Sequence, residues 1–80
     1  MLTEYIKAAM KRAHYEKMEN GRYWGEIPEL QGLWADGDTL EECRQTLQEC
    51  LEEWLIVGLR NNENIPVLDD INLNRKAEAA

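Results

Sequence analysis

One stretch, from Asp38 to Arg60, constrains the fold of this chain more than any other. Thr39 precedes an apolar series and Glu42 follows three positions later, a capping-box arrangement that satisfies free N–H groups where a helix begins. Apolar residues then recur at three- and four-residue steps and give one stripe. The stripe consists of Leu40, Cys43, Leu47, Leu51, Trp54, Leu55 and Gly58. The pattern predicts a long amphipathic helix over residues 39–60 that covers one face of a small sheet.

The length and charge of the chain limit what this helix can be part of. A chain of 80 residues is expected to form a single domain with a small core, so self-association into at least a dimer is expected. Sixteen acidic residues against nine basic ones give a net charge of −7. The acidic excess is either a solvated surface or a surface matched to a basic protein partner. Direct nucleic-acid binding is disfavoured, because neutralising phosphates requires clustered Lys and Arg.

The cysteines and the hydropathy pattern indicate a cytoplasmic protein. Cys43 and Cys50 lie seven positions apart on the predicted helix, so their Cα atoms would be about 10.5 Å apart, too far for a disulfide. Buried thiols suit a reducing compartment. No apolar run approaches the length of a membrane span and no secretory signal is recognisable, so no membrane association is expected. One histidine and two cysteines without ligand spacing predict no metal site and no cofactor.

The residues before the long helix predict a short helix and a hairpin. Leu2 to Lys11 carries apolar residues on one side, which predicts an N-terminal helix that packs either on the sheet edge or on a second subunit. Residues 12–27 predict a β-hairpin, because Asn20-Gly21 is the strongest short-range signal for a two-residue type I′ turn. Residues 33–36 then predict a short third strand.

The two-residue turn sets the predicted register of the hairpin. It places Met18 opposite Tyr23, Lys17 opposite Trp24 and His14 opposite Ile27. One face then carries His14, Met18, Tyr23, Gly25 and Ile27, and we expect this face to lie under the long helix. The other face carries Tyr15, Lys17, Trp24 and Glu26.

The residues after the long helix predict less regular structure. Asn61 or Asn62 is expected to end the helix in the left-handed conformation. Residues 65–68 are apolar but contain Pro66, which predicts an edge strand or an extended arm. We therefore expect one domain over residues 1–68 and a polar C-terminal tail over residues 69–80, the last six of them frayed.

Aromatic residues provide the candidate interface. Trp24 and Tyr15 are diagonal neighbours on the predicted outer face, where Trp24 is either covered by the terminal segments or anchors a protein interface. With Glu26 and Trp34, they form the candidate surface for a partner or a second subunit. An exposed edge strand offers a second route to oligomerisation. Trp54 lies on the helix stripe and is expected in the core.

Nothing in the sequence predicts an enzyme. His14 has no recognisable nucleophile to serve, and Cys43 and Cys50 are expected to be inert core thiols, with at most a weakly lowered pKa at Cys43. The glycines are scattered and do not form a phosphate-binding loop. A nuclease would need clustered strand carboxylates with a divalent metal ion, and the predicted register places Glu16 and Glu26 on opposite faces.

The segment from Tyr23 to Cys43, YWGEIPELQGLWADGDTLEEC, resembles the HicB family of antitoxins. That family shows an aromatic pair, a strand ending in a Pro-acidic-Leu-x-Gly turn, and a Gly-Asp-Ser/Thr-Leu-Glu-Glu start to a long helix. Here the turn spans Pro28 to Gly32 and the helix start is GDTLEE. The resemblance extends over residues 12–59 and is to a short HicB-like form without a recognisable DNA-binding domain.

The resemblance implies a partial ribonuclease H-like β-β-β-α core that binds and does not cleave. It also implies a type II antitoxin that neutralises a small basic HicA-like toxin, an mRNA-cleaving protein, by occluding its active surface. The matched positions are turns, caps and core residues, so the resemblance assigns no partner-binding residue. The alternative, from a different class, is a stand-alone oligomeric or small-ligand-binding module without a toxin partner. The expected fold class is therefore α+β, with a three-stranded antiparallel sheet packed by one long helix.

Overall fold

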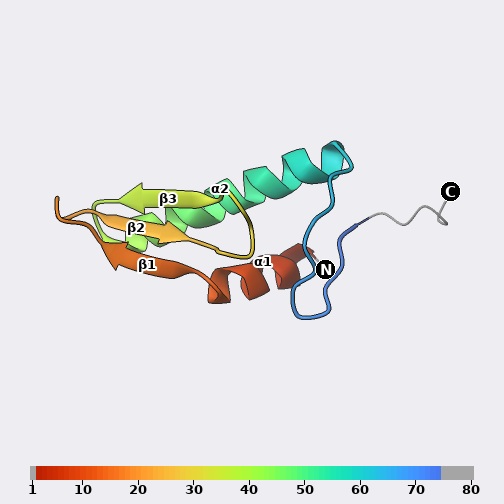
Figure 1. The fold of residues 1–80 in the computed structure, drawn as a ribbon, viewed down its shortest axis with the longest axis horizontal. Coiled ribbons are helices and arrows are strands. Elements are labelled where there is room, and N and C mark those ends of the chain that lie inside the picture. Colours follow the sequence, from red (N-terminus) through yellow and green to blue (C-terminus); the bar gives the residue numbers. More distant parts are fainter. Residues whose placement is uncertain (1, 75–80) are drawn as a thin grey trace, which may run out of the picture.

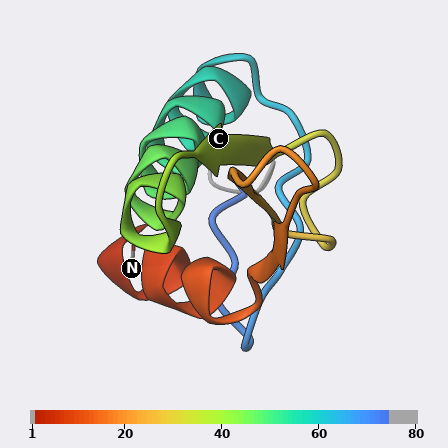
Figure 2. The same ribbon diagram turned by 90° about the vertical axis from the view of Figure 1, so that its left-hand side faces the viewer.

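The computed structural model describes residues 2–74 and contains two helices and three strands (Figure 1). Their order is α1 (Leu2–Lys11), β1 (His14–Lys17), β2 (Tyr23–Glu26), β3 (Trp34–Gly37) and α2 (Leu40–Arg60). The strands form an antiparallel sheet in the order β1-β2-β3. The sheet lies at one end of the molecule, α2 runs along its length, and α1 lies beside α2 (Figures 1 and 2). This architecture confirms the predicted α+β fold with its long helix and its short N-terminal helix.

Both ends of α2 are capped as the sequence indicates. Thr39 has an extended backbone, with φ −124° and ψ 162°, and its hydroxyl accepts a hydrogen bond from the Glu42 N–H at 3.0 Å. At the other end, Asn62 adopts the left-handed conformation with φ 56°. The Asn62 N–H donates to the Leu59 carbonyl at 3.2 Å, and the Glu63 N–H donates to the Gly58 carbonyl at 2.9 Å. These two bonds form a Schellman motif, which satisfies the last carbonyls of the helix.

The apolar stripe of α2 forms the centre of the core. Its buried members are Cys43, Leu47, Leu51, Leu55 and Gly58. Each fully buried leucine contributes about 1.5–3 kcal/mol relative to an exposed one. Leu40 differs from the prediction, being 47% exposed at the first turn, and Trp54 is half-buried at the border of the stripe. The rest of the core comes from α1, from the 27–33 turn and from residues after α2.

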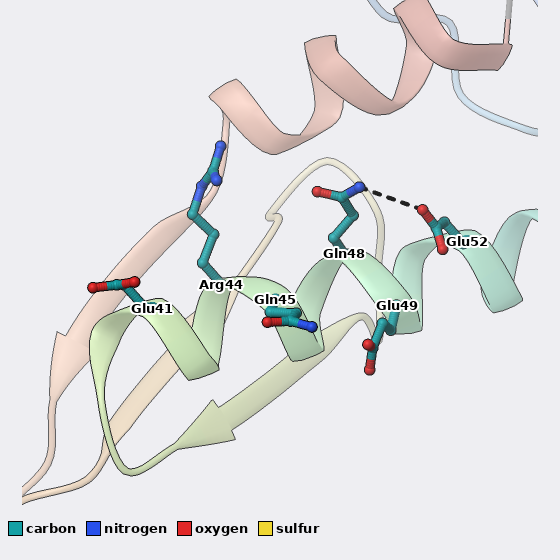
Figure 3. Close-up of a pocket in the computed structure, with 6 residues that line it drawn as sticks. All are labelled: Glu41, Arg44, Gln45, Gln48, Glu49 and Glu52. Carbon is teal, nitrogen blue, oxygen red and sulfur yellow. Dashed lines mark hydrogen bonds between the residues drawn. The ribbon is translucent and has the colours of Figure 1, made fainter.

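The opposite side of α2 is polar and exposed. Six side chains line a shallow hollow of about 480 Å³ there (Figure 3). They are Glu41, Arg44, Gln45, Gln48, Glu49 and Glu52. The Gln48 amide donates to the Glu52 carboxylate at 3.3 Å, one turn further along the helix. Five of the six side chains are exposed and Gln48 is half-buried, which fits both interpretations of the acidic excess, a solvated surface and a surface for a basic partner. Neither helix of the described chain is long and apolar enough to cross a membrane.

The hairpin turn differs from the prediction by one residue. Met18 and Arg22 close a three-residue loop, in which the Met18 N–H donates to the Arg22 carbonyl at 2.7 Å and the Gly21 N–H donates to the Met18 carbonyl at 2.9 Å. Gly21 has φ 88°, whereas Asn20 is not left-handed, so the loop is not type I′. Instead, the Asn20 side chain accepts a hydrogen bond from the Arg22 N–H at 2.9 Å. A three-residue loop with glycine in the left-handed position is the next commonest hairpin connection.

This turn makes the predicted register wrong and moves the β1 side chains to the opposite face. The observed pairs are His14 with Glu26, Tyr15 with Gly25, Glu16 with Trp24, and Lys17 with Tyr23. Because side chains alternate along a strand, a shift of one residue turns every β1 side chain over. Tyr15 therefore faces α2 and His14 faces away. The β2 assignment holds, since Gly25 and Ile27 are buried as expected.

The segment after α2 forms an extended arm and not an edge strand. Ile65 and Leu68 are buried in the core, with only 1% and 4% of their surface exposed, although neither belongs to a strand of the sheet. The Asn74 side chain accepts from the Ile65 N–H at 2.6 Å and donates to its carbonyl at 2.8 Å, which replaces a strand partner. Between these points, Asp69 and Asp70 have φ values of 48° and 64° and make a tight turn closed by Leu68 and Ile71. Of the predicted tail, residues 69–74 contact the domain and residues 75–80 lie outside the described residues.

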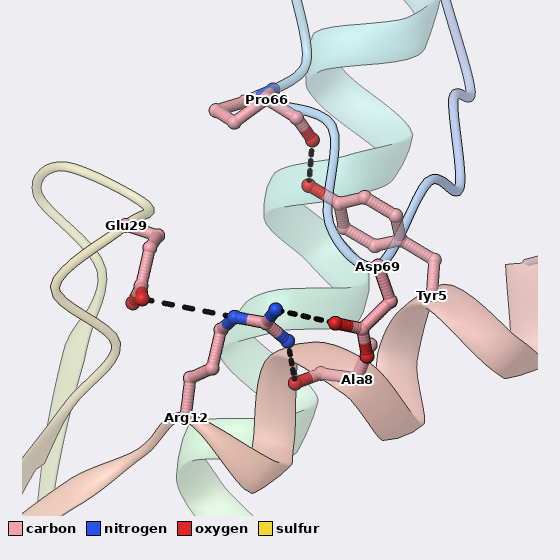
Figure 4. Close-up of polar contacts among 6 residues, drawn as sticks. All are labelled: Tyr5, Ala8, Arg12, Glu29, Pro66 and Asp69. Carbon is pink, nitrogen blue, oxygen red and sulfur yellow. Dashed lines mark hydrogen bonds and ion pairs between the residues drawn. The ribbon is translucent and has the colours of Figure 1, made fainter.

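Arg12 and Tyr5 tie the arm to α1 (Figure 4). The Arg12 guanidinium donates to the Ala8 carbonyl at 2.9 Å and to the Asp69 carboxylate at 2.5 Å, and lies 3.7 Å from the Glu29 carboxylate. The Tyr5 hydroxyl donates to the Pro66 carbonyl at 2.6 Å. The hydrogen bond from Arg12 holds the pKa of Asp69 below its ordinary value. One arginine thus joins three segments that lie far apart in the sequence.

Candidate partner-binding face

The sheet presents one face to α2, and neither helix of residues 2–74 covers the other face. Gly25 and Ala35 are buried on the α2 side, where the Cys43 thiol lies 3.6 Å from the Ala35 carbonyl. Alternation along the strands therefore places their neighbours on the other side, which we name the outer face. Two cross-strand rows define it, as given by the observed pairing. They are His14–Glu26–Trp34 and Glu16–Trp24–Asp36.

Small inner residues allow α2 to approach the sheet. A Cβ atom on Gly25 would lie 2.8 Å from the Tyr15 ring and 3.2 Å from the Cys43 sulfur, closer than van der Waals contact allows. The Tyr15 ring thus covers the glycine from the neighbouring strand, as aromatic residues do beside strand glycines. This packing leaves no room for a side chain at position 25.

Tyr15 does not join the outer aromatic residues. The prediction that it forms an exposed patch with Trp24 is wrong, because the hairpin register turns it toward α2. Its hydroxyl is buried and has no hydrogen-bond partner among the described residues. Burial raises the pKa of Tyr15, and the charge of Arg44 on α2 partly offsets this. Tyr15 is therefore part of the packing between sheet and helix.

Two tryptophans lie on the outer face, Trp24 on the central strand β2 and Trp34 on the edge strand β3. Trp34 is 55% exposed, which is unusual for so large an apolar side chain, and Trp24 is half-buried. With Glu26 and the 27–33 turn they line a small hollow of about 180 Å³. Its other lining residues are Ile27, Pro28, Leu30, Gln31, Gly32 and Leu33. The structure brings Trp24, Glu26 and Trp34 together as neighbours, on a surface that no helix covers.

The carboxylates of the outer face differ in their partners. Asp36 lies 3.4 Å from the Arg22 guanidinium, which also pairs with Asp38. Glu16 and Glu26 form no hydrogen bond or ion pair within residues 2–74. The expectation that these two glutamates lie on opposite faces is wrong, since the observed register places both on the outer face. Within the described chain, no three His, Cys, Asp or Glu side chains come close enough to hold a metal ion.

The two thiols are free, Cys43 buried and Cys50 half-buried. Burial raises the pKa of the Cys43 thiol, and the nearby Asp36 carboxylate raises it further. The expected weak lowering of this pKa by the helix N-terminus is therefore outweighed by desolvation. Cys43 is a packed core residue that is poorly suited to nucleophilic chemistry.

Comparison with known proteins identifies the family to which the chain belongs. The UPF0150-like family model matches residues 4–66, so the chain belongs to the UPF0150-like family, a small family related to HicB. UPF0150 protein ssr1258 of Synechocystis sp. is 40% identical over 42 residues, which cover 48% of this chain and 61% of that protein. The crystal structure of TTHA0281 from Thermus thermophilus superposes with a TM-score of 0.86 at 42% identity, covering 94% of each chain.

Proposed function

We propose that the chain is a HicB-like antitoxin that binds a small basic HicA-like toxin, an mRNA-cleaving protein, and blocks its active surface. The observation that carries the proposal is the outer face, where the exposed Trp34, the half-buried Trp24 and unpaired carboxylates lie together on a domain of a HicB-related family. An apolar anchor surrounded by charge is the usual composition of a protein-binding surface.

Occlusion requires no chemistry from the antitoxin. A chain with net charge −7 attracts a basic partner, and the outer glutamates orient it. Burial of Trp24 and Trp34 against the partner then supplies affinity. We therefore propose that the chain is not an enzyme, that it uses a partial ribonuclease H-like fold for binding, and that it acts in the cytoplasm without direct nucleic-acid contact.

We also propose that the chain forms a dimer or higher oligomer. Both β1 and β3 are sheet edges, whose free backbone groups can pair with another chain. Along α2, an apolar hollow of about 370 Å³ is lined by Leu33, Cys50, Trp54 and Val57, among others. Val57 is 50% exposed there. Covering this hollow with a second copy would remove apolar surface from water.

The size of the outer hollow favours a protein partner over a small ligand. Sites for drug-sized molecules have volumes of about 300–1,000 Å³. The hollow between Trp24 and Trp34, at about 180 Å³, is well below that range. The outer hollow therefore suits part of a protein partner better than a whole small ligand.

Co-expression with the product of an adjacent gene, where that gene encodes a small basic protein, tests the proposed function. We expect the partner alone to stop growth and to cleave mRNA, and we expect co-expression of this chain to restore growth and yield a complex on purification. The double variant Trp24→Ala, Trp34→Ala should fail to restore growth. Ile56→Ala on α2 is the matched control, because Ile56 is 55% exposed, the same as Trp34. A toxic partner that stays unbound and toxic would contradict the proposal.

A further inference from the structure

We propose that the hollow between Trp24 and Trp34 is a socket for one cationic side chain, arginine or lysine, of a basic protein partner. We name it the tryptophan socket, defined by Trp24, Trp34, Glu26 and the 27–33 turn. The inference rests on the proposed function only in taking the partner to be a basic protein. It deepens that function by naming the group that the outer face recognises.

The geometry provides walls of the right kind. Trp34 pairs with Glu26 across β2 and β3, and Trp24, two residues before Glu26, lies on the same face. Trp24 and Trp34 both line one hollow, and the 27–33 turn supplies most of its other lining residues. At about 180 Å³ the hollow matches a single long side chain and not a whole ligand. The aliphatic stem of lysine or arginine would cover apolar indole surface while its head stays near the carboxylate.

The charges select a cation. Tryptophan has the most attractive ring for a cation among the aromatic side chains. Glu26 adds a full negative charge and has no ion-pair partner within residues 2–74. No Lys or Arg is among the residues described as lining the socket. Glu26 would repel an anion, and a neutral group would leave the charge of Glu26 uncompensated.

The chain itself shows the same recognition elsewhere. On the inner side, the Lys17 ammonium lies 5.9 Å from the centre of the Tyr23 ring, so that cation is already engaged. Arg22, the base beside the outer face, is held by Asp36 and Asp38. Lys17 and Arg22 are therefore each engaged within this chain, and His14, the cross-strand neighbour of Glu26, forms no ion pair with it within residues 2–74. The socket is left for a cation from another molecule.

Small probes test the socket without any toxin. The full chain is titrated with two cations, n-butylguanidinium chloride and n-butylammonium chloride. The neutral control is N-butylurea, which has a similar shape, with sodium chloride added to match the ionic strength. The readout is the indole N–H signals in a ¹H–¹⁵N spectrum, with Trp54 on α2 as an internal control. We expect saturable shifts at Trp24 and Trp34 with the cations and none with the urea. Equal shifts with the urea, or unmoved Trp24 and Trp34 signals, would overturn the socket.

Two variants connect the shifts to named groups. Glu26→Gln should weaken cation binding about two- to fivefold, as expected for loss of an exposed charge partner, whereas Glu53→Gln on α2 should not change it. Trp34→Ala should weaken it about tenfold or more. Cation binding unchanged in both socket variants would overturn the assignment. If the probes fail to bind while the toxin is still neutralised, the socket is wrong and the antitoxin function stands. If the probes bind but no toxin partner is neutralised, the socket stands and the antitoxin function is wrong.

Discussion

The inner and outer faces of the β1-β2-β3 sheet carry different side chains where β2 and β3 lie side by side. The inner face has Gly25 and Ala35, and α2 lies close against it. The outer face has two tryptophans and unpaired glutamates, with Trp34 55% exposed. Small residues inside are explained by close packing, whereas Trp34, which is more than half exposed, contributes little to folding. The difference indicates that stability and recognition are separated onto the two faces, and the following changes test that separation in order of expected effect.

Truncating the inner core should have the largest effect on stability. Leu47 on α2 is fully buried, so Leu47→Ala removes buried apolar surface and leaves a cavity, which should lower the free energy of unfolding by about 2–5 kcal/mol. Urea unfolding followed by circular dichroism measures it. Leu40→Ala on the same helix is the control, because Leu40 is 47% exposed and should cost far less. Equal losses in the two variants would contradict the placement of the core.

Adding volume to the inner face should have the next largest effect. Gly25→Val would force a methyl-bearing Cβ against the Tyr15 ring, which would lie 2.8 Å away, and should cost about 1–3 kcal/mol. The same unfolding measurement applies. Combining the change with Tyr15→Ala should cost less than the sum of the two single changes, because the clash is shared. Additive losses would show that Tyr15 does not cover Gly25.

Releasing the arm from α1 should have a smaller effect that depends on pH. Because the pKa of Asp69 is lowered in the folded state, its pairing with Arg12 stabilises the fold at pH values above 3.8, the ordinary pKa of this carboxyl group. That stabilisation is lost as the pH falls through the folded pKa. The stability difference between the wild type and Asp69→Asn should therefore be present at neutral pH and shrink in acid. A difference that stays constant from neutral to strongly acidic pH would contradict the Arg12–Asp69 pairing.

Changing the outer face should have the smallest effect on stability. Trp34→Ala removes a side chain that is 55% exposed, so the free energy of unfolding should change by less than about 1 kcal/mol. Thermal and urea unfolding of the variant beside the wild type measure this. A loss as large as that of Leu47→Ala would mean that Trp34 supports the fold, and the separation of the two faces would fail.

Local signals in the sequence predicted most of the fold. Thr39 and Glu42 predicted where α2 begins, and the asparagines after Arg60 predicted its left-handed end. The β1 register was missed because Asn20-Gly21 suits both a two-residue turn and the observed three-residue loop. The Asn20 side chain favours the second by accepting from the Arg22 N–H, which the pattern alone does not reveal.

The path of the arm could not be predicted from local patterns, because contacts between residues far apart in the sequence hold it. Asp69 and Asp70 form a turn with two left-handed residues, and Asp69 is held by Arg12 from the other end of the chain. Trp24 and Glu26 were placed on the outer face because strand alternation in β2 was read correctly, whereas the face of Trp34 was not predicted and comes from its pairing with Glu26. Tyr15 was misplaced because an error of one residue in the register reverses the faces of a strand.

The affinity of Trp34→Ala for the basic partner, measured by calorimetry, tests the central claim most directly. If the outer face binds the partner, the variant should lose about 2 kcal/mol of binding free energy, roughly a thirtyfold weaker Kd, while its stability stays within about 1 kcal/mol of the wild type. Ile56→Ala, with the same exposed fraction on α2, should bind as the wild type does. Unchanged affinity in Trp34→Ala, or an equal loss in Ile56→Ala, would contradict the assignment of recognition to the outer face.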